Sequence, residues 1–186
     1  MKTTILGIII VMAGIFSAEK TFAQTQEPKF DVGIQFSTLR LREIGEGAAG
    51  VGGWFSYHVT GHLALEGVVN RYPENPSGNF GETQVLFGAL AGRTFDNLGV
   101  FAKARAGFIH FGGDFFTLRL NDRTHPTIDL GGVLEYYPSK HIVLRMDVGD
   151  SIIMYGRSTY LGAGPTVTTL GTLHNLGAAF GIGIRF

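Results

Sequence analysis

The amino-acid sequence predicts an all-β protein, an eight-stranded antiparallel up-and-down transmembrane β-barrel that follows a cleaved signal peptide. Three observations predict this fold class. Apolar residues alternate with small or polar ones from Asn175 to the terminal Phe186, segments of the same period fill most of the preceding chain, and a short apolar run stands near the N-terminus. Side chains alternate sides along a strand, and about 9 to 11 residues of tilted strand cross a bilayer.

The N-terminal run has the order of a secretory signal. Lys2 precedes apolar residues 5–16, and a more polar stretch ends at Ala23. The run is too short for a spanning helix, which needs roughly 20 apolar residues, so an uncleaved anchor is the lesser interpretation. Cleavage after Ala23 is expected, with Ala18 as the other candidate. We therefore predict a signal peptide over residues 1–23 and one outer-membrane β-barrel domain over residues 24–186.

Composition excludes several classes of function. The chain has 15 basic and 15 acidic side chains, a balance that predicts no nucleic-acid partner. It has no cysteine, so disulfides cannot hold an exported fold together. The glycine run at residues 50–53 falls within a predicted strand rather than before a helix, so it is no phosphate-binding loop. The histidines lack zinc-site spacing, and no cofactor is predicted.

Strands follow one another through the rest of the chain. The fifth is the clearest internal one, because Val100 and Ala102 begin an apolar face opposite Lys103 and Arg105. The fourth strand could present either face to the lipid, because residues 84–87 do not alternate between polar and apolar. In order, strands are predicted near residues 29–40, 51–58, 63–72, 82–95, 100–109, 128–136, 142–149 and 175–186.

The connections are of two lengths. Turns of a few residues are predicted at 59–61, 96–98 and 138–140, and longer loops at 73–81, 112–125 and 151–172, while the first connection, near 41–47, is short. Short turns that alternate with longer loops are typical of outer-membrane barrels, which keep the short turns on the periplasmic side. An even number of strands places both chain ends on that side.

The longer loops are where a specific function is expected. Phe115, Phe116, Leu118 and Leu120 make the third of them apolar, and residues 151–155 are candidates to continue a strand beyond the membrane. Such residues more often pack the loops together than bind a partner. An unidentified surface partner is therefore kept as an expectation for these loops.

The charges decide which face points inward. Most charged side chains of the predicted strands share one face. A basic side chain on the lipid face near the bilayer midplane costs about 2 to 4 kcal/mol, so these charged side chains must point inward or face water. An eight-stranded barrel has an interior that side chains just fill. Seven glycines on the same face are expected to make room for long charged side chains. The predicted interior network consists of Glu66, Lys103, Arg105, Asp129, Glu135, Arg145, Asp147 and Arg185, with Asp31 on the same face.

Other interpretations of the same pattern differ in what surrounds the barrel or passes through it. A soluble exported barrel of the lipocalin or streptavidin type would place the apolar face inside, but it does not account for strands of bilayer length or the terminal Phe186. A narrow pore would need an open lumen, whereas balanced interior charges favour a plugged one.

Three stretches carry a resemblance to a known family. Residues 99–108, 130–138 and 143–150, with the closing strand, resemble the small outer-membrane β-barrel family related to the OmpA transmembrane domain and OmpX. The resemblance implies a location in the outer membrane of a Gram-negative envelope, with lipid and lipopolysaccharide as neighbours. It implies that the barrel-assembly machinery reads the closing strand, through Phe180, Ile182, Ile184 and Phe186. It also implies a central salt-bridge plug, for which Glu66, Lys103, Arg105, Glu135 and Arg145 are the candidates.

The resemblance is a weaker guide to activity than to fold and location. Some small barrels modify lipopolysaccharide with a Ser and a His close together on the lipid-facing surface. Here only Ser56 and His58 stand two residues apart in a strand, and both are expected inside. The predicted function is therefore a non-enzymatic outer-membrane barrel with a structural or surface-interaction role, the alternatives being a lipopolysaccharide-modifying enzyme or a narrow pore.

Overall fold

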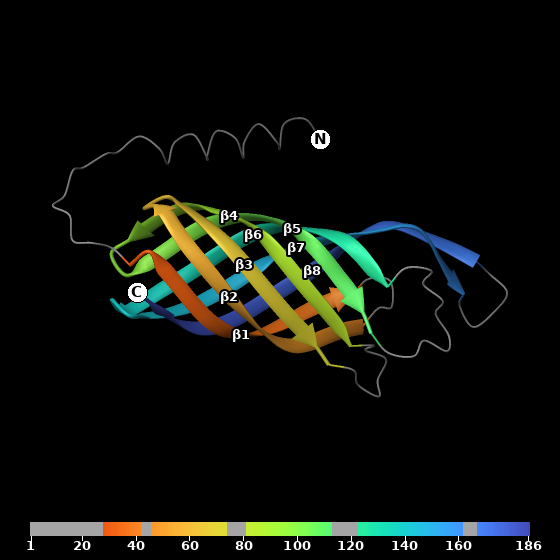
Figure 1. Cartoon of the computed structure of the whole chain (residues 1–186), viewed down its shortest axis with the longest axis horizontal. Coiled ribbons are helices and arrows are strands. Elements are labelled where there is room, and N and C mark those ends of the chain that lie inside the picture. Colours follow the sequence, from red (N-terminus) through yellow and green to blue (C-terminus); the bar gives the residue numbers. More distant parts are fainter. Residues whose placement is uncertain (1–27, 42–45, 74–80, 113–122, 162–166) are drawn as a thin grey trace.

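A computed structural model of the chain describes residues 28–41, 46–73, 81–112, 123–161 and 167–186. In these residues eight strands form one closed antiparallel barrel in the order β1-β2-β3-β4-β5-β6-β7-β8 (Figure 1). The strands are β1 Phe30–Leu41, β2 Glu46–Thr60, β3 Leu63–Tyr72, β4 Glu82–Phe95, β5 Leu98–Phe111, β6 Thr124–Ser139, β7 Ile142–Leu161 and β8 Val167–Arg185. The predicted fold class is confirmed, whereas the predicted signal peptide lies outside the described residues.

The barrel is closed by its first and last strands. Residues 31–40 of β1 pair with residues 176–185 of β8, so the chain ends meet on one side of the wall. The start of β1 and the end of β8 lie at the same end of the barrel, with the short β2–β3, β4–β5 and β6–β7 turns (Figure 1). Asp96, in the β4–β5 turn, has φ 48°, a left-handed conformation that Asp adopts more readily than most residues.

Each strand has one apolar face that points outward. Ile34, Phe87 and Phe180 are more than half exposed, whereas charged side chains at inward positions, such as Arg105 and Arg145, are buried inside. The facing of β4, which the sequence left open, is now decided, because Gln84 and Leu86 point inward while Phe87 points outward. This arrangement is that of a barrel whose outer wall faces an apolar solvent.

Two predicted loops are shorter than expected. β7 continues to Leu161 and β8 begins at Val167, so the loop prediction for 151–172 was wrong for most of its length, whereas the predicted strand continuation over residues 151–155 is confirmed. β6 begins at Thr124 rather than near Ile128, and it includes Pro126. Lipid imposes an apolar face only within the membrane, so strand segments beyond it carry no apolar alternation from which to predict them. Figure 1 shows the paired ends of β7 and β8 projecting beyond the other strands.

The apolar part of the interior is gathered in three clusters. One, at the end away from the short turns, contains Leu39, Tyr72, Ile109, Phe111 and Ile153 among others. The second contains Trp54, Val68, Leu86, Tyr137 and Val143. The third contains Ala64, Leu90, Phe101 and Val133. Polar and charged side chains occupy the rest of the interior. In the described part of the chain, no helix has the length and hydropathy to cross a bilayer.

Candidate functional site: the charged interior

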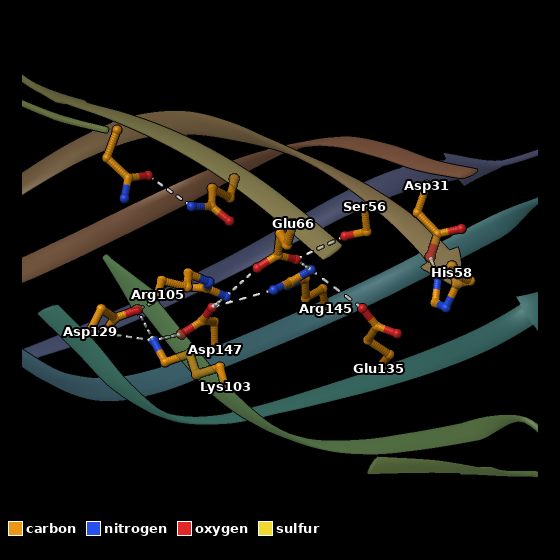
Figure 2. Close-up of polar contacts among 12 residues, drawn as sticks. Asp31, Ser56, His58, Glu66, Lys103, Arg105, Asp129, Glu135, Arg145 and Asp147 are labelled. Atoms are coloured by element: carbon orange, nitrogen blue, oxygen red, sulfur yellow. Dashed lines mark hydrogen bonds and ion pairs between the residues drawn. The ribbon is translucent and has the colours of Figure 1, made fainter. Parts of the chain in front are cut away.

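Seven charged side chains from four strands meet inside the barrel. They come from β3, β5, β6 and β7, each at an inward position of its strand's alternation. Every one of them is at most 6% exposed. Figure 2 shows them converging between the strands. The members are Glu66, Lys103, Arg105, Asp129, Glu135, Arg145 and Asp147, which we call the central network.

Arg105 joins three strands to its own. Its Nη2 lies 2.5 Å from Glu66 Oε1 on β3 and 2.7 Å from Asp147 Oδ2 on β7. Its Nη1 donates to Asp129 Oδ2 on β6 at 2.9 Å. A planar guanidinium presents several donors at once, which suits it to bridging carboxylates from different directions.

Arg145 is the most buried large cation of the network, at 1% exposed. It pairs with Glu66, and its Nη1 lies 3.4 Å from Glu135 Oε1. Its guanidinium carbon stands 5.2 Å from the centre of the Trp54 ring, so one face of the cation rests on the indole. Arg105 and Arg145 therefore share the carboxylate of Glu66.

Lys103 completes the network beside two glycines. Its Nζ lies 2.7 Å from Asp129 Oδ2 and 2.5 Å from Asp147 Oδ1. A Cβ added at Gly131 or Gly149 would approach the Lys103 Cε to 2.9 or 2.6 Å. These two glycines thus leave room for a long charged side chain, as the sequence predicts.

The other interior glycines serve a different side chain. A Cβ at Gly33, Gly181 or Gly183 would lie 2.3, 2.5 or 3.0 Å from an atom of Trp54. The indole therefore occupies the space that three glycines leave on β1 and β8. Sequence reasoning missed this role of Trp54; the signal was the coincidence of the only tryptophan with a glycine-rich closing strand.

Arg185 does not reach the central network. Its Nε donates to Asp31 Oδ1 at 3.0 Å across the β1–β8 pair, and His58 Nε2 lies 2.8 Å from Asp31 Oδ2. Figure 2 shows Asp31 and His58 apart from the central residues. The Arg185 guanidinium stacks on the Tyr137 ring at 4.0 Å, and the Tyr137 hydroxyl donates to Glu135 Oε2 at 2.5 Å. Among the described contacts, Tyr137 is thus the link between Arg185 and the network.

A chain of uncharged polar side chains adjoins the network. Gln35 donates to Asn70, Asn70 to Gln84, and Gln84 to Ser151, at 2.7, 3.2 and 3.1 Å. These residues link β1, β3, β4 and β7 across the lumen. Sequence reasoning did not select these residues. An uncharged amide is excluded from the lipid face less strongly than a charged side chain, so its facing is harder to predict. The cavity that they line together with Lys103 and Asp147 has a volume of about 30 Å³, room for a few water molecules at most.

The predicted assembly-signal residues lie on the outside of the closing strand. Phe180, Ile182 and Ile184 are each at least half exposed on the barrel wall. Phe186 stacks on Phe30, with ring centroids 5.8 Å apart, and its carbonyl accepts the Phe30 amide at 2.9 Å. The last residue is therefore seated against the first strand.

Ser56 and His58, the serine–histidine pair that the sequence offers, are not joined to each other. Ser56 donates to Glu66 at 2.9 Å while His58 contacts Asp31, so the two residues serve different partners. On the outer wall His174 Nδ1 lies 2.6 Å from Asp150 Oδ2, and both side chains are exposed. Among the described residues, no group of three histidine or acidic side chains could hold a metal ion. The predicted aromatic loop residues 115–120 lie outside the described residues.

Comparison with solved structures identifies the architecture. The N-terminal β-barrel domain of Pseudomonas aeruginosa OprF aligns over 86% of this chain and 100% of its own length, with 14% identity and a TM-score of 0.53. Neisserial surface protein A aligns over 84% of this chain and 97% of its own, with 16% identity and a TM-score of 0.52. At such identities the likeness establishes a shared fold. No protein-family model and no curated protein sequence matches the chain.

Proposed function

Because the chain has the fold of the small eight-stranded outer-membrane β-barrels, we propose that it is an integral outer-membrane protein with a structural or surface-interaction role and a plugged lumen. The observation that carries this is the distribution of charge. Buried ion pairs fill the centre of the barrel, while outward residues such as Ile34 and Phe180 are apolar and exposed. Only an apolar solvent outside makes that distribution favourable.

The plug is supported by what lies on either side of the central network. The apolar cluster around Leu39 and Phe111 occupies one end of the interior, and the cluster around Leu90 and Phe101 lies toward the other. Between them, the cavity lined by Gln35, Lys103 and Asp147 among the described residues has a volume of about 30 Å³. A conducting pore needs a continuous water-filled path, so a cavity of this size supports a plugged lumen.

We expect the purified, refolded protein to insert into planar bilayers without producing ion-conducting channels. The measurement is single-channel current across a bilayer, with an open porin as the positive control. Insertion is checked separately by the different migration of unboiled and boiled protein on a denaturing gel. Reproducible unitary currents from inserted protein would contradict the plug, and recovery from soluble periplasm would contradict the membrane location.

A lipid-modifying activity is not favoured by the outer wall. On the outer wall, the contact of His174 in the described structure is with Asp150 rather than with a serine. A hydrolase of the nucleophilic type needs a hydroxyl within hydrogen-bond reach of its base.

The β7–β8 hairpin supports a surface-interaction role. Its pairing extends to Leu161 and Val167, whereas the pairing of β7 with β6 stops at Ile153 and that of β8 with β1 stops at Leu176. In the part of the chain that the structure describes, the outer halves of both strands therefore have one unpaired edge. An exposed strand edge offers backbone donors and acceptors to an added strand.

Shortening this hairpin is expected to separate binding from folding. A variant that joins residue 155 to residue 172 through Asn-Gly should keep the heat-dependent gel shift, because every barrel strand retains both neighbours. Cells displaying it should bind a panel of purified extracellular proteins more weakly than cells displaying the natural hairpin. Equal binding by both would exclude the hairpin as the interaction surface.

A further inference from the structure

The outer wall carries a polar row at the end away from the short turns. Arg71, Thr83, His110 and Thr124 are direct register partners on β3, β4, β5 and β6. All four occupy outward positions of their strands, and Arg71, His110 and Thr124 are exposed. We call this set the rim row. Neighbouring strands lie about 4.8 Å apart, so the row extends across about 14 Å of the wall.

The row stands directly above the apolar wall. Val69 and Phe108, two residues nearer the short turns on the same strands, are outward and 49% and 43% exposed. From Leu98 to His110, β5 advances twelve residues, about 40 Å along the strand and about 30 Å along the barrel axis at the usual tilt. That is close to the thickness of a bilayer's hydrocarbon core. At His110 the rim row therefore lies where lipid headgroups begin, and the long side chain of Arg71 can extend toward the same level.

Contacts within the row hold its donors in place. Arg71 Nη1 donates to Thr83 Oγ1 at 2.8 Å and to the Gly81 carbonyl at 3.2 Å. Nε and Nη2 of Arg71 have no partner among the described residues, so one edge of the guanidinium remains free. His110 Nδ1 lies 2.8 Å from Thr124 Oγ1. When Thr124 donates in that bond, His110 Nε2 carries the hydrogen and is a second donor facing outward.

We propose that the rim row binds the phosphate of an outer-leaflet lipid headgroup, whose acyl chains lie on the apolar wall below. The free edge of a guanidinium matches phosphate in geometry and charge. A lipid supplies an anion for Arg71 and hydrocarbon for Val69 and Phe108 together, whereas a free anion supplies only the first. The proposal rests on the membrane location proposed above.

The rest of the barrel provides two matched controls. Arg40 is also outward at this end, but it shares a register row with Asp150 through Leu176, so an acid stands on the same part of the wall. Arg93 is outward on β4 at the opposite end, over the Phe95 ring at 5.6 Å. Neither belongs to the rim row.

The test is a titration of the refolded full-length barrel in maltoside micelles, read by native mass spectrometry. The probes are bisphosphorylated lipid A, dephosphorylated lipid A and inorganic phosphate. Arg71→Gln should weaken binding of bisphosphorylated lipid A about 10-fold, the loss expected for one charge-assisted hydrogen-bonded contact. Arg40→Gln and Arg93→Gln should change it less than twofold, and dephosphorylated lipid A should not distinguish Arg71→Gln from the natural protein.

Thr83→Val provides a second, independent variant. It removes the hydroxyl that holds Arg71 and should weaken the same binding about threefold while leaving every charge in place. Equal losses in all three arginine variants, or no loss in Arg71→Gln, would overturn the site. Displacement of the lipid by millimolar inorganic phosphate would assign the row to free anions instead and overturn the lipid proposal. A barrel that fractionates with outer membranes but fails this test loses only this inference.

Discussion

Arg145→Met is expected to lower the free energy of unfolding by about 3 to 5 kcal/mol, the cost of leaving buried carboxylates without their partner. Arg145 is 1% exposed and contacts Glu66, Glu135 and Asp147. Methionine fills similar volume but restores no charge, so the effect reports electrostatics more than packing. Denaturant titration of the barrel in lipid vesicles measures it, with fluorescence of Trp54 as the signal.

Arg93→Met is the matched control for this prediction. Arg93 also stands over an aromatic ring, at 5.6 Å, but on the outer wall. Its loss should cost less than about 1 kcal/mol, the usual value of an exposed cation–π contact. Adding Glu135→Gln to Arg145→Met should recover part of the loss, since the carboxylate whose ion pair is with Arg145 becomes neutral. A loss below about 1 kcal/mol for Arg145→Met alone would mean that the network does not stabilise the barrel.

Gly181→Ala is expected to destabilise the barrel by about 2 to 3 kcal/mol because the space beside it is already filled. Its Cβ would lie 2.5 Å from Trp54 Cζ3 and 2.6 Å from the Ile34 carbonyl oxygen. The indole cannot retreat freely, since the Arg145 guanidinium covers it. The same denaturant titration measures the loss, and a shift in the Trp54 emission maximum should accompany it.

Gly177→Ala controls for the substitution itself. Gly177 lies on the same strand and inward face, but a Cβ there would meet no atom closer than 3.9 Å. Its replacement should be neutral or slightly stabilising, because alanine loses less chain entropy on folding. Equal destabilisation by both variants would show that β8 tolerates no side chain at these positions for reasons unrelated to Trp54.

The sequence could predict which charged side chains of the central network face inward, but not which of them contact each other. Glu66, Arg105 and Arg145 could be placed inside because lipid excludes charge, which is a local rule applied strand by strand. Their partners could not be assigned, since contacts across the lumen depend on how the eight strands are staggered. That stagger pairs Arg185 with Asp31, which also contacts His58, rather than with an acid of the network.

The sequence by itself determined that this chain forms an eight-stranded barrel with charges inside, because a bilayer permits few spanning structures and imposes a period of two on each strand. Only the tertiary structure decided what fills the interior: that glycines on β1 and β8 accommodate Trp54, and that amides link β1, β3, β4 and β7. It also decided how far the β7–β8 hairpin extends. The interior contacts depend on strand register and barrel closure, which a single strand's sequence does not reveal. The hairpin extends beyond the lipid, where the solvent imposes no apolar alternation on the sequence.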